Sequence, residues 1–226
     1  MAGLIMPALA AEHSVRVFDL KPPGRADLEY VQGNVCDLEA LRAACHGRDV
    51  LLYMAMGAQD WRSTHGITSA LDANAKGVYL ALHAAHDAGI SHAVYTSSMS
   101  VYDGDLLARR FPDEDLPPDA VELYGFTKRM GEEACRAAAR GWGMSVNALR
   151  LCLPIPDQNW LDQTREGVPT IATSASDTAR AVLAAIAWRP PGFQAFTISG
   201  DYRQTSMNMS RARRYLDWEP LFRPVK

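Results

Sequence analysis

The sequence predicts an α/β fold with a doubly wound parallel sheet, on the strength of two observations. Short apolar runs alternate with helical stretches along the chain, and this alternation is typical of right-handed βαβ units. Several runs are nearly continuous in hydrophobic residues, as parallel strands covered on both faces should be. The 226 residues are enough for one such domain with a full core. Strands are expected over 14–20, 49–55, 92–98, 145–152 and 193–199.

Capping residues mark the helices between these strands. Asp37 is a good N-cap for one helix, and Gly47 suits the C-terminal end of the same helix. Ser174 and Asp177 have the spacing of a capping box at the start of another. Two longer helical stretches each end in a glycine. The helices are expected over 37–47, 67–89, 121–141 and 174–188.

Two segments that contain several prolines and aspartates, 103–120 and 153–173, break this alternation. Each follows a predicted strand directly or nearly so. In open α/β sheets, the loops beyond the carboxyl ends of the strands build the ligand crevice. We therefore predict a single domain over residues 1–226, in which these two segments cover a substrate.

Charge and cysteine usage exclude several classes of protein. The net charge of −3 gives no broad electrostatic case for binding nucleic acid or an anionic membrane. No run of about 18 apolar residues is present, so no membrane-spanning helix is predicted. The four cysteines are scattered without metal-binding or redox spacing, which favours a reducing cytoplasm and no metal site.

Tyr124 and Lys128 form the strongest chemical signal. Their spacing of four residues in a helical stretch puts both side chains on one helix face. A neighbouring ammonium favours the phenolate, so we expect Lys128 to lower the pKa of Tyr124 from its ordinary value of about 10. Tyr124 could then act as a general acid/base near neutral pH. The alternative is a chance pair on an ordinary helix.

Two polar features precede this pair. Ser97, Ser98 and Ser100 lie where a predicted strand ends, and a hydroxyl there could hydrogen-bond a substrate oxygen. Asn74 lies inside a predicted helix, where asparagine is unfavourable, and it could kink the helix to hold a water. For the serines, the ordinary alternative is that their hydroxyls hydrogen-bond the backbone of their own strand end. For Asn74, it is an asparagine side chain that points into solvent.

In this order and spacing, the motifs resemble the extended short-chain dehydrogenase/reductases, also called the NAD-dependent epimerase/dehydratase family. The resemblance runs from Asp19 through VQGNVCD (31–37) and LLYMAMG (51–57) to the serine strand and Tyr-x-x-x-Lys. It reaches the tail, where DWEP (217–220) is similar to the family's Gly-Trp-x-Pro-like end. It implies a Rossmann-type fold, hydride-transfer chemistry and a nicotinamide cofactor.

The resemblance implies four catalytic positions. Tyr124 would be the acid/base, with Lys128 as its pKa partner and a ligand of the cofactor ribose. Ser98 would be the serine whose hydroxyl orients the substrate oxygen. Asn74 matches the asparagine whose carbonyl helps to hold a water near the lysine.

The resemblance also implies how the cofactor binds. Asp19 matches the acid that binds the adenosine ribose hydroxyls. A carboxylate there would repel a 2′-phosphate, so NAD is favoured over NADP. The other implied cofactor-binding residues are Gly3 in the phosphate-binding loop, Asn34 and Val35 against the adenine, Met54, Ala55 and Met56 beside the phosphates and ribose, and Pro154 near the nicotinamide carboxamide.

Departures from the family pattern bear on the substrate. Leu153 stands where nucleotide-sugar members carry an asparagine, so a nucleotide sugar is disfavoured. ELYGFTK (122–128) and RLCLPIPDQNW (150–160) are similar to uronate dehydrogenases, but Trp160 stands where those carry a carboxylate-binding arginine. We therefore predict an oxidoreductase or epimerase that transfers hydride on a small polyhydroxylated, sugar-like substrate. The alternative is a catalytically impaired cofactor-binding, regulatory or scaffold protein of the same fold.

The resemblance also suggests that the helices at 67–89 and 121–141 pair across a homodimer as a four-helix bundle. The alternative is that both lie on their own sheet.

One part of the family pattern is absent. AGLIM (2–6) matches the middle of the glycine loop, with Gly3 as its second glycine and Met6 in place of the third, and Pro7 fits the first turn of the helix. The first glycine and first strand are missing, and we expect them upstream of residue 1. Without them, the sheet should have two inner edges with unpaired backbone groups. The alternative is a sheet that closes differently and a damaged phosphate site.

Overall fold

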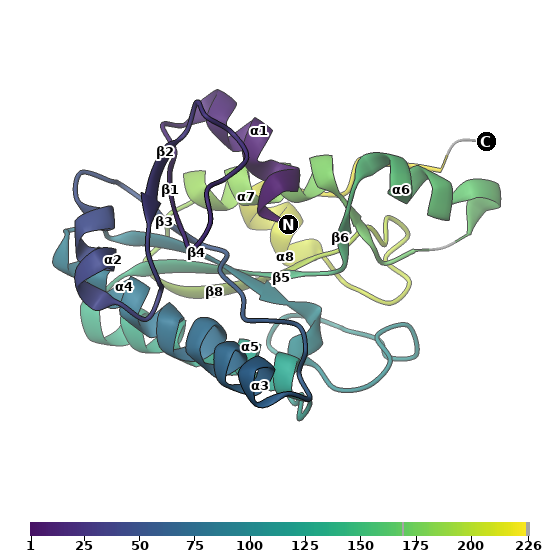
Figure 1. Cartoon of the computed structure of the whole chain (residues 1–226). Coiled ribbons are helices and arrows are strands. Elements are labelled where there is room, and N and C mark those ends of the chain that lie inside the picture. The colour runs from purple at the N-terminus through teal and green to yellow at the C-terminus, as the bar shows by residue number, and fades with distance from the viewer. Residues whose placement is uncertain (169, 225–226) are drawn as a thin grey trace.

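The central element of the fold is a four-stranded parallel sheet, seen in a computed structural model that describes residues 1–168 and 170–224 (Figure 1). Its order confirms the predicted α/β class, and all three pairings are parallel. Every residue of the two middle strands is buried. The strands, in sheet order, are β3 (Leu51–Tyr53), β4 (His92–Ser98), β5 (Ser145–Leu151) and β8 (Gly192–Ile198).

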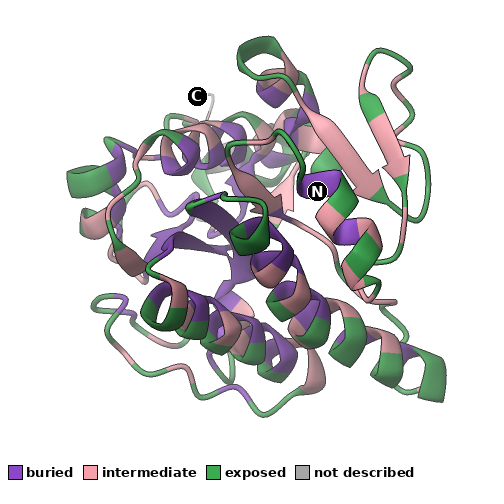
Figure 2. Ribbon diagram, turned by 90° about the vertical axis from the view of Figure 1, so that its left-hand side faces the viewer, coloured by how far each residue is buried: buried purple, intermediate pink, exposed green. Residues whose placement is uncertain are grey.

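Helices cover both faces of this sheet, and alternate residues of β4 fill the two cores. Ala93 and Tyr95 pack with the apolar sides of α2 (Leu38–Cys45), α4 (Gly77–Asp87) and α5 (Leu123–Trp142). Val94 packs in the other core with α1 (Ala2–Glu12), α7 (Ala175–Ala187) and α8 (Ser210–Leu216). Figure 2 shows the buried sheet between helices whose outer faces are exposed. No helix among the described residues combines the length and the apolar composition needed to cross a membrane.

Two strands stand apart from the central sheet. β1 (Arg16–Asp19) and β2 (Glu29–Gln32) pair with each other in parallel, and within residues 1–168 and 170–224 they pair with no strand of the central sheet. The expectation of an interrupted sheet with unpaired inner edges is therefore confirmed. β2 itself was not predicted from the sequence.

The predicted caps are present. The Asp37 side chain accepts a hydrogen bond from the amide of Ala40 at 3.1 Å, and the Ser174 side chain accepts one from the amide of Asp177 at 3.1 Å. The helical stretch predicted over 67–89 is confirmed as an unbroken helical run from Thr64 to Asp87, which a π-helical turn interrupts. That stretch contains α3 (Thr64–Leu71), a π-helical turn and α4, and such turns commonly mark functional sites.

The stretch AGLIM opens a helix, and the assignment of Gly3 to a phosphate-binding loop stays a prediction. α1 begins at Ala2, so Gly3 lies in the first helical turn, whereas the expectation that Pro7 lies in that turn is wrong. The helix is stabilised by Ile5 and Leu9, which lie four residues apart and bury one helix face in the core beside α7.

The two long segments meet beyond the carboxyl ends of β4 and β5. Residues 103–120 contain no helix or strand, and Phe111 bridges to Met207. Residues 153–173 hold β6 (Pro154–Ile155), α6 (Asp157–Gln163), a 3₁₀ turn (Arg165–Gly167) and the first residue of β7 (Thr173–Ser174), and Pro169 lies outside the described residues. Phe111 from the first segment and Ile171 from the second share one buried cluster with Met99.

Candidate functional site

Ser98, Tyr124 and Lys128 come together at the carboxyl end of β4. Ser98 is the last residue of the strand, while Tyr124 and Lys128 lie one turn apart at the start of α5. α5 approaches this end closely because it carries Gly125, where a Cβ would clash with the backbone oxygen of Ser100. The close approach brings the half-buried Tyr124 within hydrogen-bonding reach of the Ser98 side chain.

The expected lowering of the Tyr124 pKa by Lys128 is not found. Burial raises the pKa of Tyr124 above its ordinary value, and only the hydrogen bond with Ser98 opposes this. The Lys128 ammonium is directed elsewhere, because its Nζ donates to the carbonyl of Thr96 at 2.8 Å and lies 5.1 Å from the centre of the Tyr95 ring. In this structure Tyr124 is therefore a neutral phenol at neutral pH.

Lys128 is itself a perturbed group. Burial lowers its pKa from 10.5 to about 8, although the nearby Cys135 and Glu132 favour the charged form. A lysine with this pKa exchanges its proton at mildly alkaline pH.

The low pKa of Lys128 predicts a pH-dependent stability. Between pH 8 and 10.5 the unfolded chain holds this proton more tightly than the folded one, so the free energy of unfolding rises with pH across that window. Lys128→Met removes the titration. In urea unfolding at a series of pH values, the free energy of unfolding of the wild type should rise by up to about 3 kcal/mol relative to this variant as the pH increases across the window. A difference that stays constant with pH would contradict the burial of a charged lysine.

Asn74 is buried in the π-helical turn (Asp72–Lys76), so the alternative of a solvated asparagine is wrong. Its side-chain amide donates to the Thr127 hydroxyl on α5 at 3.0 Å, and its side-chain oxygen accepts from the amide of Gly57 at 3.4 Å. Asn74 thus links the segment after β3 to the helix that carries Tyr124 and Lys128.

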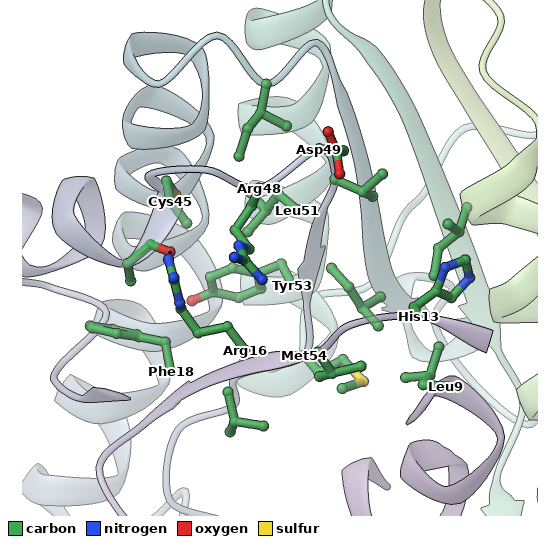
Figure 3. A pocket seen from close by; sticks show the side chains of 18 of the residues that line it. Leu9, His13, Arg16, Phe18, Cys45, Arg48, Asp49, Leu51, Tyr53 and Met54 are labelled. Atoms are coloured by element: carbon green, nitrogen blue, oxygen red, sulfur yellow. Dashed lines mark hydrogen bonds between the residues drawn. The ribbon is translucent and has the colours of Figure 1, made fainter. Parts of the chain in front are cut away.

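The residues that the sequence assigned to the cofactor are only partly brought together. Asp19 at the end of β1, Val35, Met54 and Ala55 line one cavity of about 500 Å³ between β1 and β3 (Figure 3). Met54 is among the residues labelled there. The remaining assigned residues, Gly3, Asn34, Met56, Lys128 and Pro154, do not line this cavity.

Sequence reasoning missed a buried ion pair behind the catalytic candidates. The Arg150 guanidinium donates to both carboxylate oxygens of Glu132, at 2.9 and 2.8 Å, and the Ser97 hydroxyl donates to the same carboxylate at 2.7 Å. Burial would raise the pKa of Glu132, but the bonds and charge of Arg150 hold it below its usual range. The sequence did carry a signal for Glu132, because its spacing of four residues from Lys128 puts both side chains on one helix face.

The same arginine reaches the first long segment. Arg150 donates through Nη1 to the Tyr102 hydroxyl at 2.6 Å and to the Glu114 carbonyl at 3.0 Å. It therefore fixes residues 103–120 to β5, one strand away from Ser98.

A second missed residue is Trp61. Its ring stacks on the Tyr124 ring, with centroids 5.1 Å apart and planes at 11°, and 39% of the residue is exposed. No sequence signal links Trp61 to Tyr124, because the two residues lie far apart along the chain and Trp61 is not part of any motif identified in the sequence.

Comparisons with known proteins point to one family. Residues 4–185 match the NAD dependent epimerase/dehydratase family. A 3 beta-hydroxysteroid dehydrogenase/Delta 5→4-isomerase of Mycobacterium tuberculosis is 34% identical over 160 residues, which are 66% of this chain and 42% of that protein. An uncharacterised protein of Sinorhizobium fredii is 31% identical over 139 residues, 60% of this chain and 34% of that protein. The chain thus spans less than half the length of these curated relatives.

Solved structures share the fold. A mutant uronate dehydrogenase of Agrobacterium tumefaciens complexed with NAD has a TM-score of 0.77 at 20% identity, covering 97% of this chain and 80% of that one. A UDP-glucose 4-epimerase of Thermotoga maritima with UDP-glucose has a TM-score of 0.78 at 16% identity, covering 98% and 90%. At these identities the likeness concerns the fold alone.

Proposed function

We propose, since this chain belongs to the NAD-dependent epimerase/dehydratase family, that it transfers a hydride between NAD and a small polyhydroxylated substrate. The observation that carries the proposal is the meeting of Ser98, Tyr124 and Lys128 at the carboxyl end of β4. Ligand sites in open α/β sheets lie at this edge.

In the proposed reaction, Tyr124 would first lose its own proton to solvent and, as the phenolate, would take the proton of a substrate hydroxyl. A bound NAD would supply the acceptor for the hydride from the carbon that bears this hydroxyl. Ser98 holds the substrate oxygen by a hydrogen bond and fixes its distance from Tyr124. Because burial raises the pKa of Tyr124, proton abstraction requires a nearby positive charge. Lys128 provides that charge when its Nζ leaves the Thr96 carbonyl. An epimerase would return the hydride to the opposite face of the oxidised carbon.

The residues around the end of β1 fit NAD. The Asp19 carboxylate is exposed and accepts the amide of Lys21 at 3.1 Å, and within the described residues it forms no ion pair. Both carboxylate oxygens therefore keep acceptor positions open to ribose hydroxyls. Apolar side chains of Val35, Met54 and Ala55 line the same cavity and suit an adenine ring.

Asp19→Ser is expected to reduce the preference for NADH over NADPH by about tenfold or more, because it removes a charge that repels the 2′-phosphate. Fluorescence titration with each dinucleotide measures the two dissociation constants. Asp27→Ser, at another exposed aspartate in the β1–β2 connection, is the matched control. An unchanged ratio of the two constants in Asp19→Ser would assign the ribose to another residue.

A polyhydroxylated substrate, rather than a nucleotide sugar, is favoured by Leu153. This leucine follows β5, has a φ of 40° and is 63% exposed, so its apolar side chain offers nothing to a diphosphate. A panel of sugars, sugar acids, simple alcohols and UDP-glucose, followed by the absorbance of NADH, tests the substrate class. Turnover of UDP-glucose above all others would overturn this part of the proposal.

We also propose a homodimer in a reducing cytoplasm. Exposed apolar side chains on α3, α4 and α5 support the dimer, and their burial against a second copy would be favourable. None of the four cysteines forms a disulfide, which supports the location. Light scattering of the purified protein would give the oligomeric state. The exposed side chains are Ile67, Tyr79, Phe126 and Met130.

A further inference from the structure

Trp61 presents an apolar ring next to the proposed acid/base. Its ring lies against the ring of Tyr124, with centroids 5.1 Å apart and planes at 11°. Tyr124 covers one face of the indole, yet 39% of Trp61 is exposed, so the exposed area lies on the other face and the edges. A substrate whose hydroxyl reaches the Tyr124 oxygen therefore has its carbon skeleton beside a flat apolar surface.

The segment between β3 and α3 holds Trp61 in this position. The amide of Ala58 donates to the Ser69 hydroxyl of α3 at 2.8 Å. The carbonyl of Asp60 accepts from the amide and the hydroxyl of Ser63, at 3.2 and 3.1 Å, and Ser63 is the N-cap of α3. α3 in turn packs beside α5, the helix that carries the acid/base (Figure 1). A surface fixed in advance in this way binds a ligand at a lower cost in ordering.

An apolar side chain also lies on the opposite side of Ser98. The sheet order places β4 between β3 and β5, so the segments that follow β3 and β5 flank the strand end that carries Ser98. Leu153 follows β5 and is exposed. Its φ of 40° lies in the left-handed region, which is unfavourable for leucine, and strain of this kind is concentrated at ligand sites. The substrate therefore meets apolar side chains on both sides of the group that holds its hydroxyl.

These surroundings favour a substrate with one flat C–H face. A closed-ring sugar carries its hydroxyls around the rim, and its C–H face can pack on an indole and bury apolar surface. The rim hydroxyls stay free to hydrogen-bond Ser98 and Tyr124. An open-chain polyol has no such face, and it loses more rotational freedom when it binds.

We propose that Trp61 determines specificity by stacking on the C–H face of a closed-ring polyhydroxylated substrate, a pyranose or a cyclitol, while Ser98 and Tyr124 bind one of its hydroxyls. This inference rests on the proposed function, because it defines the substrate class of the same site. The site binds such rings in preference to open-chain polyols with the same number of hydroxyls.

Nuclear magnetic resonance of the chain, labelled with ¹⁵N at its tryptophans, tests the contact. Each of the five tryptophans gives one indole N–H signal, and Trp61→Phe identifies the signal of Trp61. The closed-ring probes are inositols and methyl hexopyranosides, and hexitols and tetritols are the open-chain probes with matching numbers of hydroxyls. We expect a saturable shift of the Trp61 signal, with an affinity for at least one closed-ring probe about tenfold above that for its open-chain match.

Trp142 is the internal control for this titration. It is the last residue of α5, whereas Tyr124 lies in the first turn of the same helix. Like Trp61 it is partly exposed and stacks on one ring, that of His86. A sugar that binds aromatic rings without selectivity would shift both signals, so the Trp142 signal should stay unchanged.

Variants of Trp61 separate substrate recognition from packing. Trp61→Leu removes the flat surface and should weaken binding of the closed-ring probe about tenfold, as measured by saturation-transfer resonance of the sugar. Trp61→Phe keeps a flat ring and should keep most of the affinity. With a closed-ring substrate that turns over, KM of Trp61→Leu should rise more than kcat falls, and Trp142→Leu should leave both constants unchanged.

The titrations are made with and without NADH. A Trp61 signal that moves in neither series, moves equally with the open-chain probes or moves together with that of Trp142 would overturn the proposal. An equal loss of kcat for closed-ring and open-chain substrates in Trp61→Leu, with KM unchanged, would also overturn it, because Trp61 would then only hold Tyr124 in place. Failure of NADH to bind, with the sugar-dependent shift of Trp61 intact, would contradict the oxidoreductase and leave this inference standing.

Discussion

Tyr124→Phe is expected to lower turnover by about 10²–10⁴-fold while the protein keeps its fold. The phenol oxygen is the only group removed. It lies within hydrogen-bonding reach of Ser98 and is the group proposed to take the substrate proton. The ring of phenylalanine preserves the stack on Trp61, so neither the loop after β3 nor the start of α5 loses its packing.

The measurement is the turnover number of the best substrate from the panel, with the circular dichroism spectrum and melting temperature as checks on folding. Tyr79→Phe is the matched control, because Tyr79 is exposed on α4 and lies outside the candidate site. Near-normal turnover of Tyr124→Phe, with both variants folded, would mean that another group moves the proton.

Glu132→Ala is expected to destabilise the fold by about 3–5 kcal/mol. The substitution leaves the Arg150 guanidinium buried without its carboxylate partner, and it removes the acceptor of the Ser97 hydroxyl. Both side chains of the ion pair are almost completely buried, so water cannot replace the lost interactions. We also expect residues 103–120 to loosen, because Arg150 holds Glu114 within this segment and Tyr102 just before it.

Urea unfolding of Glu132→Ala beside Glu133→Ala isolates this effect. Glu133 is the next residue of α5, but it is exposed and, among the described residues, pairs only with Arg136 at 2.8 Å, so its loss should change stability by less than about 1 kcal/mol. Equal stabilities of the two variants would show that the buried pair contributes no more than a surface one.

The central strands were predictable because a strand that is buried on both faces is a nearly continuous run of hydrophobic residues in the sequence. β4 spans the predicted range 92–98, and β5 differs from its range by one residue. β2 has no such hydrophobic run, since only two of its four residues, Tyr30 and Val31, are apolar and both are only partly buried.

The family resemblance implied that Ser98, Tyr124 and Lys128 share one site. From the residues alone, only the place of Ser98 at a strand end and of Tyr124 and Lys128 on one helix face followed. Their electrostatics did not. The pKa of Tyr124 depends on burial and on where the Lys128 ammonium points, and both are set by tertiary packing against Thr96 and Tyr95. The stacking of Trp61 on Tyr124 could not be predicted either, because it joins segments that are distant in sequence.

At the amino terminus, the sequence placed Pro7 in the first helical turn. The helix begins at Ala2 instead, with Ile5 and Leu9 buried on one of its faces, so Gly3 lies in that turn and Pro7 beyond it. The family resemblance also implied the assignment of Asp19, Met54 and Ala55, and these residues do lie around one cavity. Whether they hold a dinucleotide is the central claim of the account.

Titration of the purified chain with NADH tests that claim most directly. Saturable binding, seen as a change in NADH fluorescence and weakened in Asp19→Ala, is the predicted result. Absence of binding at millimolar NADH, by a chain whose circular dichroism shows it folded, would contradict the proposed oxidoreductase and favour a regulatory or scaffold protein of the same fold.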